Sequence, residues 1–184
     1  MKSCITACDL KNLFRSLIPT LRTILLCSGL CLPGFVLGKS QIVSFYINTT
    51  HFYPSESFEV AVVYESSDRG LATGMGIRVH YDSSQISIDS ITKVLSQGQV
   101  GIQTKQDTAD YDNDPATDYY ITAGWADVNG AWPETVSQPT QLLQLAATTV
   151  ANFSGTRLNL TIASRDSSYV ALGDALHLTS TIGD

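Results

Sequence analysis

Five aspartates fall within twelve residues of this chain: Asp107, Asp110, Asp112, Asp114 and Asp118. From Asp110 the order is D-Y-D-N-D-P-A-T-D, which places carboxylates at positions 1, 3, 5 and 9 of one loop. Alternate carboxylates of this kind wrap oxygen ligands around Ca²⁺ in EF-hand-type loops. We therefore predict a structural Ca²⁺ site formed by these five aspartates.

The loop departs from the EF-hand pattern at two positions. Pro115 stands where a glycine makes the sharp turn, and Ile121 stands where a bidentate glutamate closes the site. The alternative is an acidic connector that is merely solvated, as most charge runs are. We favour a metal because five close aspartates repel one another, so that a loop without a cation would be strained open at neutral pH.

A second oxygen-rich turn, Asp127-Val128-Asn129-Gly130, follows soon after and has a tryptophan on each side. An exposed aromatic ring beside polar groups is typical of a sugar-binding face, so Trp132, Asn129 and Asp127 are candidate ligand-binding residues. Asp127 and Asn129 could also complete the metal coordination. Trp125 lies within an apolar run and is predicted to belong to the core.

Signals for catalysis are weak. Asp127 and Glu134 are the only acidic pair near aromatic residues, and nothing in the sequence fixes their geometry as a glycosidase needs. The chain has no G-x-S-x-G, no phosphate loop and no pairing of cysteine with histidine. His51, His80 and His177 lack a second ligand at metal spacing, so we predict surface or strand-face positions for them. The chain is predicted not to be an enzyme.

The elements that would position these residues are short β-rich runs separated by Gly, Ser, Asn, Asp and Pro. In 57–64, Phe58, Val60, Val62 and Tyr64 alternate with more polar residues, as in a half-buried strand. In 72–81, one face carries Met75, Ile77, Val79 and Tyr81, and the other carries Gly74, Gly76, Arg78 and His80. The predicted strands are 41–48, 57–64, 72–81, 85–94, 119–127, 141–150, 155–163 and 174–181. We predict an all-β, two-sheet jelly-roll sandwich of about eight or nine strands.

Two segments resemble the cohesin family. G-L-A-T-G-M-G-I-R-V-H-Y-D-S-S-Q-I (Gly70 to Ile86) resembles a cohesin strand pair, and Y-I-T-A-G-W-A-D-V-N-G-A-W-P (Tyr120 to Pro133) is similar to cohesin-like modules of secreted bacterial surface proteins. The likeness spans most of residues 41–182. It implies a nine-stranded jelly roll related to carbohydrate-binding modules, with a role in protein or glycan attachment. It does not imply a dockerin partner.

The first 38 residues have the order of an export signal. Lys2, Lys11, Arg15 and Arg22 precede the apolar run Thr23 to Leu37, and the small residue Gly38 follows. The run is short and contains glycine and proline, whereas a membrane span needs about 20 apolar residues. We predict a signal peptide at 1–38 and a cohesin-like domain at 39–184, with an uncleaved anchor as the alternative. Lipidation of Cys27 or Cys31 is less favoured, because leucine precedes both.

Leader removal would leave seven basic against sixteen acidic residues, a formal net charge of −9, and no cysteine. This balance makes nucleic acid a poor partner. Without the leader the domain would have no membrane segment. We therefore predict a secreted or cell-surface, non-catalytic binding or adhesion module, stabilised by Ca²⁺, whose partner is a glycan or an extracellular protein. The alternatives are a structural subunit of a surface layer or fibre and, less favoured, a glycoside hydrolase. The sequence leaves the oligomeric state open.

Overall fold

The computed structural model of the chain describes residues 41–67, 74–95, 97–129, 138–163 and 170–181. All of them belong to the second of the two units into which the chain divides, Leu37–Asp184. The predicted signal peptide, 1–38, lies outside the described residues and stays a prediction. Within the described ranges, no helix has the length and hydrophobicity needed to cross a membrane.

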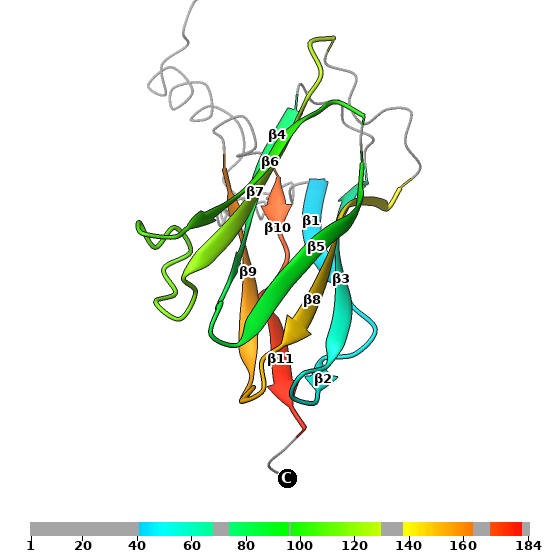
Figure 1. Cartoon of the computed structure of the whole chain (residues 1–184). Helices are drawn as coiled ribbons and strands as arrows, with labels where there is room; N and C mark the ends of the chain where they lie inside the picture. The colour runs from blue at the N-terminus through cyan, green and yellow to red at the C-terminus, as the bar shows by residue number, and fades with distance from the viewer. Residues whose placement is uncertain (1–40, 68–73, 96, 130–137, 164–169, 182–184) are drawn as a thin grey trace, which may run out of the picture. The chain divides into compact units, whose positions relative to one another are not determined.

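The described residues form eleven β-strands (Figure 1). In chain order they are β1 (Gln41–Tyr46), β2 (His51–Phe52), β3 (Ser57–Ser66), β4 (Gly74–Tyr81), β5 (Ile86–Val94), β6 (Gln99–Gln106), β7 (Tyr119–Ala126), β8 (Thr140–Thr149), β9 (Thr156–Ile162), β10 (Ala171–Leu172) and β11 (Leu176–Ser180).

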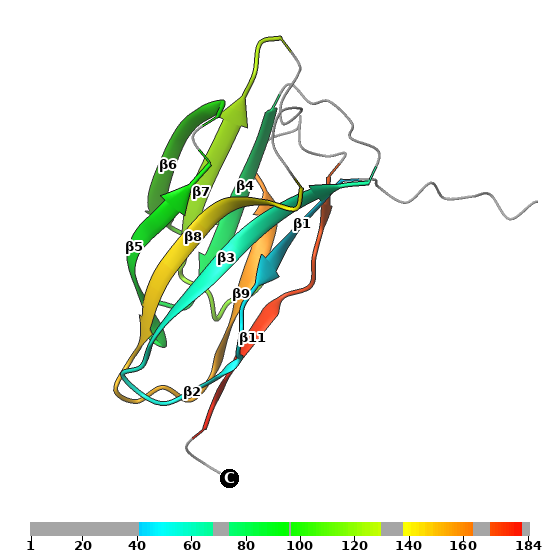
Figure 2. The same ribbon diagram turned by 90° about the vertical axis from the view of Figure 1, so that its right-hand side faces the viewer.

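The strands make two mixed sheets that pack face to face (Figure 2). The five-stranded sheet has the order β10-β1-β3-β8-β5, and the six-stranded sheet has the order β2-β11-β9-β4-β7-β6. β1 with β10 and β11 with β2 pair in parallel, and the other pairs are antiparallel. The predicted all-β sandwich is therefore confirmed.

The core lies between the two sheets and follows the alternation of the sequence. Phe58, Val60, Val62 and Tyr64 of β3 are buried, as are Met75, Ile77, Val79 and Tyr81 of β4. Leu142, Leu143 and Leu145 of β8 join them. Trp125 is 2% exposed and donates its indole N–H to the Leu95 carbonyl over 2.9 Å, which confirms its predicted place in the core.

All eight predicted strands are present, with ends shifted by at most two residues. β6 was not predicted, because nearly all of its side chains are exposed and it lacks the apolar alternation that marks a half-buried strand. β2 and β10 have only two residues each, too few for a pattern. The unpredicted β6 matters for the site, because it leads directly into the acidic loop.

Candidate functional site

The acidic loop, residues 107–118, connects β6 to β7 at one end of the six-stranded sheet. Its two ends are tied together, since the Asp107 N–H donates to the Asp118 carbonyl over 2.8 Å, and the Asp118 N–H donates to the Tyr81 carbonyl over 3.1 Å. Asp110 and Asn113 have φ values of 50° and 56°, in the left-handed region that aspartate and asparagine tolerate better than most residues. These two turns fold the loop back onto the outer face of β4 and β9.

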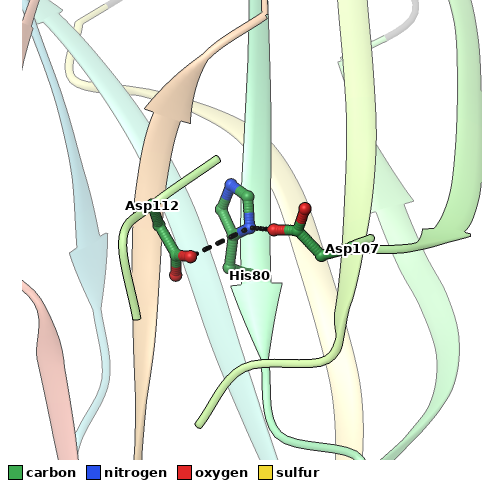
Figure 3. A group of neighbouring side chains, drawn as sticks. All are labelled: His80, Asp107 and Asp112. Carbon is green, nitrogen blue, oxygen red and sulfur yellow. Dashed lines mark hydrogen bonds and ion pairs between the residues drawn. The ribbon is translucent and has the colours of Figure 1, made fainter. Parts of the chain in front are cut away.

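His80 is the residue of β4 on which the loop closes, and it is fully buried. Its Nδ1 lies 2.7 Å from Asp107 Oδ2 and 3.8 Å from Asp112 Oδ1 (Figure 3). Its Nε2 lies 2.7 Å from Thr161 Oγ1 of β9. Because a carboxylate only accepts hydrogen bonds, Nδ1 carries the proton that it donates to Asp107. The buried imidazole thus joins the loop to two neighbouring strands.

Asp112 and Asp114 bind the neighbouring strand, β9. The Asn159 amide donates to Asp112 Oδ2 over 2.8 Å and to Asp114 Oδ2 over 3.0 Å. The Thr117 hydroxyl donates to Asp112 Oδ2 over 2.9 Å. The Arg157 guanidinium donates from Nε to Asp114. Both carboxylates are therefore held by protein donors.

Asp114 is the most strongly perturbed acid of the loop. Its residue is 3% exposed, and the hydrogen bond from Arg157 lowers its pKa to about 2, with further help from the Ala116 N–H and the Asn159 amide. Burial alone would raise this pKa. The same pairing raises the pKa of Arg157. Asp114 is thus a fixed negative charge that Arg157 balances at neutral pH.

The two remaining aspartates of the predicted metal site have other surroundings. Asp118 accepts hydrogen bonds from the Ser83 N–H over 2.7 Å and from the Ser83 hydroxyl over 2.6 Å. Asp110 is exposed at a turn of the loop. The structure therefore brings Asp107 and Asp112 together, and it gives Asp114 and Asp118 separate protein partners.

Two residues of the loop and His80 of β4 form a group that could hold a metal ion. Ligand atoms of His80, Asp107 and Asp112 lie within 4.8 Å of one another, and His80 would bind an ion through Nδ1 only after releasing the proton that it donates to Asp107. The set is one nitrogen and two carboxylates, whereas Ca²⁺ takes six to eight oxygens. Two of the five predicted ligands are thus placed to share an ion. The Ca²⁺ site itself stays a prediction.

The second oxygen-rich turn lies at the opposite end of β7 from the acidic loop. Asp127 follows Ala126, the last residue of β7, and its carboxylate accepts the Asn129 N–H over 2.9 Å. A strand of eight residues spans about 25 Å. Asp127 and Asn129 therefore cannot complete a metal site in the loop, which corrects that expectation. Trp132 and Glu134 lie outside the described residues.

Sequence reasoning missed the strand residues that hold the loop. His80 was expected at a surface or on a strand face, and it is buried because residues 107–118 cover the outer face of β4. Arg157, Asn159 and Thr161 alternate along β9, which pairs with β4 in the register His80–Asn159. The alternation that puts Arg78 and His80 on one face was visible in the sequence. The pairing of β4 with β9, some 80 residues away, was not.

An aromatic cluster lies beside this group. The Arg78 guanidinium carbon is 4.1 Å from the ring centre of Tyr111 and 5.5 Å from that of Tyr120. Tyr111 and Tyr120 meet edge to face with centroids 5.8 Å apart. Arg78 also donates to the Ile162 carbonyl over 2.8 Å. The Tyr111 side chain is 48% exposed, and its ring packs on the Arg78 guanidinium and the Tyr120 ring.

Comparison with solved structures identifies the architecture. The sixth cohesin of scaffoldin B from Acetivibrio cellulolyticus, solved in complex with a dockerin, aligns with a TM-score of 0.52 and 14% sequence identity, over 77% of this chain and 99% of that one. The seventh ScaB type I cohesin from Pseudobacteroides cellulosolvens aligns with a TM-score of 0.52 and 6% identity, over 78% and 94%. The chain has a cohesin-like fold. A cohesin from Clostridium thermocellum, solved in a type I cohesin–dockerin complex, aligns with a TM-score of 0.52 and 10% identity, over 77% and 99%.

The similarity of this cohesin-like domain to known proteins lies in its fold. No family model matches the sequence. No curated protein matches it either. At sequence identities of 6% to 14%, the shared feature is the two-sheet architecture.

Proposed function

We propose that the cohesin-like domain is an extracellular, non-catalytic module that binds a protein partner through the outer face of β6 and β7. The observation that carries the proposal is a pair of exposed apolar side chains on this face, Val100 and Tyr111, which are 70% and 48% exposed. Tyrosine is a common anchor of protein interfaces, and Val100 would add apolar contact area to it.

Both anchors lie on the same face of the six-stranded sheet. A Cβ built on Gly124 would point at Val100 Cγ2, 3.1 Å away, which places the Val100 side chain over the outer face of β7. Tyr111 covers Arg78 and Tyr120 on that face. Gln103 and Lys105 of β6 pair with Thr122 and Tyr120 and lie between the anchors. We call the surface formed by Val100, Gln103, Lys105 and Tyr111 the β6–β7 face.

The acidic loop supports this role by fixing Tyr111 in advance. The Tyr111 N–H donates to both Asp107 carboxylate oxygens at 3.3 Å, and Asp107 in turn binds buried His80. A side chain that is ordered before binding loses little conformational entropy on association. The loop thus holds Tyr111 in a fixed position, as expected for a residue that contacts a partner.

The fold adds independent support for a protein partner. Two of the similar structures are cohesins solved in complex with dockerins. Those complexes support a protein-binding, non-catalytic role for the present domain, outside the cell. Fold analogy is a weak warrant for the identity of a partner, so the proposal commits to a protein partner and to the β6–β7 face only.

We also propose that the acidic loop binds a structural divalent cation, which the sequence predicts to be Ca²⁺. Its support is the convergence of Asp107 and Asp112 on one point beside His80. The ion would add to the protein donors that already hold Asp112 and Asp114. Its role would be to stiffen the loop that carries Tyr111.

The experiment is affinity chromatography of secreted proteins on the immobilised chain, followed by calorimetry with each purified partner. We expect Val100→Ser combined with Tyr111→Ser to weaken binding by at least about tenfold, which corresponds to about 1.4 kcal/mol. Val128→Ser combined with Tyr53→Ser is the matched control, because these side chains are also exposed, at 98% and 62%, and lie outside the β6–β7 face. Equal affinities for the two double variants would refute the proposed face.

A further inference from the structure

The outer face of the five-stranded sheet carries a hollow that the protein-binding proposal does not use. Tyr46 of β1 pairs with Ala61 of β3, and Ala61 pairs with Gln144 of β8. The three residues thus form a row across adjacent strands, which lie side by side in Figure 2. Because neighbouring strands are about 4.8 Å apart, Tyr46 and Gln144 stand about 10 Å apart at their Cα atoms.

The hollow exists because the middle residue of this row is small. Ala61 forms its floor, Tyr46 one wall and Gln144 the other, and Asn48, Glu59 and Gln141 also line it. The hollow is open to solvent and has a volume of about 170 Å³. We call this feature the Tyr46 groove. The alternation of β3 points Ala61 away from the core, so the groove opens on the side opposite to buried Val60 and Val62.

The polar side chains of the groove are ordered by one another. Gln141 donates from Nε2 to Gln144 Oε1 over 2.8 Å, and Gln144 donates from Nε2 to Glu59 Oε2. Such a network fixes the amide planes before any ligand arrives, which lowers the entropic cost of binding. A carboxylate has about four acceptor sites, so Glu59 can accept further donors from a ligand.

The Tyr46 ring supplies the exposed aromatic part of the groove, and Ile47 lines it as well. Tyr46 is 63% exposed, although it lies in a strand whose neighbours Val43 and Phe45 pack into the core. A tyrosine ring offers a flat apolar face and a polar edge at low conformational cost. The groove therefore combines one aromatic face with a hydrogen-bonded set of two amides and a carboxylate.

The charges of the groove narrow the class of ligand. Glu59 is the single charged residue among those that line it, and the whole chain carries a formal net charge of −6. An anionic polymer such as nucleic acid or a sulfated glycan would be repelled. A ligand with an apolar ring face and many groups that both donate and accept hydrogen bonds would satisfy the ring, the amides and the carboxylate together.

We propose that the Tyr46 groove is a binding subsite for a neutral oligosaccharide. One sugar ring stacks its C–H face on Tyr46, and its hydroxyls donate to Glu59 and exchange hydrogen bonds with the amides of Gln141 and Gln144. This subsite is distinct from the turn at Asp127 and Asn129, and it lies on the opposite sheet from the β6–β7 face. It therefore does not depend on the protein-binding function.

The test is binding of the full-length chain to soluble neutral sugars. Cellohexaose, xylohexaose, mannohexaose and chitohexaose are titrated by calorimetry, and the amide signals of residues 46, 61 and 144 are followed by NMR. We expect at least one hexasaccharide to bind with a dissociation constant between about 1 μM and 1 mM. We expect Tyr46→Ala to weaken that binding at least about tenfold, and Ala61→Leu to abolish it by filling the floor.

The matched control is Tyr53→Ala, which removes a tyrosine of nearly equal exposure, 62%, outside the groove. It should leave the affinity unchanged, as should the double substitution at Val100 and Tyr111. The proposal is overturned if none of the four sugars binds at millimolar concentration, or if Tyr53→Ala weakens binding as much as Tyr46→Ala. A purified protein partner lost with Tyr46→Ala, in the absence of sugar binding, would assign the groove to a protein and overturn it equally.

Discussion

Asp114 carries the buried negative charge of the acidic loop that Arg157 balances. Its oxygens accept hydrogen bonds from Arg157, Asn159 and the Ala116 N–H, and its pKa falls to about 2 from an ordinary 3.8. In the unfolded chain the same carboxyl would titrate near its ordinary value. The folded state therefore binds fewer protons than the unfolded state between these two values.

This difference predicts an acid-dependent loss of stability. The contribution of Asp114 is fully present above about pH 4 and is lost as the pH falls through the folded pKa of about 2. Chemical unfolding in the presence of chelator, measured from pH 6 to pH 2, should give a free energy of unfolding that decreases in this window. Asp114→Asn should lower the free energy at pH 6 and flatten the decrease. An unchanged slope in Asp114→Asn would contradict the assigned pairing.

The imidazole of His80 presents a different case, because it is buried with both ring nitrogens engaged. Replacement by alanine would remove the short hydrogen bond from His80 to the Asp107 carboxylate, whose side chain has no exposure, and would leave it only the longer hydrogen bonds from the Tyr111 N–H. Loss of one partner of a buried polar pair costs about 2 to 4 kcal/mol. We expect His80→Ala to lower the free energy of unfolding by about this amount.

The control for this substitution is His177→Ala on β11, because His177 is exposed. Exposed substitutions usually change stability by less than about 0.5 kcal/mol. Urea unfolding of both variants, of Asp107→Asn and of the double variant His80→Ala with Asp107→Asn would measure the coupling between His80 and Asp107. Additive effects in the double variant would show that the two side chains do not act as a pair.

The strands were predictable as elements where one of their faces is apolar. The sequences of β3 and β4 alternate between apolar and more polar or small residues, and the sandwich was predicted from eight short β-rich runs. β6 was not predictable, because all of its side chains except the half-buried Ile102 are exposed, and its pairing with β7 makes it a strand. The acidic loop was visible as a cluster, but its donors on β9 depend on a pairing between strands far apart in the sequence.

A bound metal ion would stabilise the folded conformation of the whole acidic loop. We expect Ca²⁺ at millimolar concentration to raise the midpoint of thermal unfolding relative to chelator, because a ligand at 100 times its dissociation constant adds about 2.7 kcal/mol. Asp112→Asn should abolish the shift, whereas Asp110→Asn should retain it, because Asp110 lies outside the group of His80, Asp107 and Asp112. A shift with Zn²⁺ and none with Ca²⁺ would reassign the ion to a nitrogen-accepting metal. No shift with either would remove the metal.

At the scale of the whole molecule, the two sheets offer their outer faces to different chemistry. The six-stranded sheet presents exposed Val100 and Tyr111, and the five-stranded sheet presents Tyr46 beside an ordered amide network. The core between them separates the two surfaces. The two proposals together predict a domain that binds a protein and an oligosaccharide at the same time. A structural subunit of a layer or fibre would instead join copies of itself, for example through strand edges.

The sheet edges argue against self-association. β2 and β10 are only two residues long, and β5 has register irregularities near Ile88 and Ile91 that disturb its ladder. β6 carries an irregularity between Gln99 and Gly101 and the charged Lys105. Short, bulged and charged edges are the usual protection against edge pairing.

We therefore expect the chain to stay monomeric. Sedimentation or light scattering of the purified chain should give the mass of one chain, 19.9 kDa if the leader is retained, across the micromolar range. A partner protein bound at the β6–β7 face should add its own mass once, and a hexasaccharide should bind the same complex without displacing it. Concentration-dependent oligomers that dissociate on Thr104→Pro would instead favour the structural-subunit alternative, because the Thr104 N–H lies on the open edge of β6 and proline removes this backbone donor, which an added strand needs.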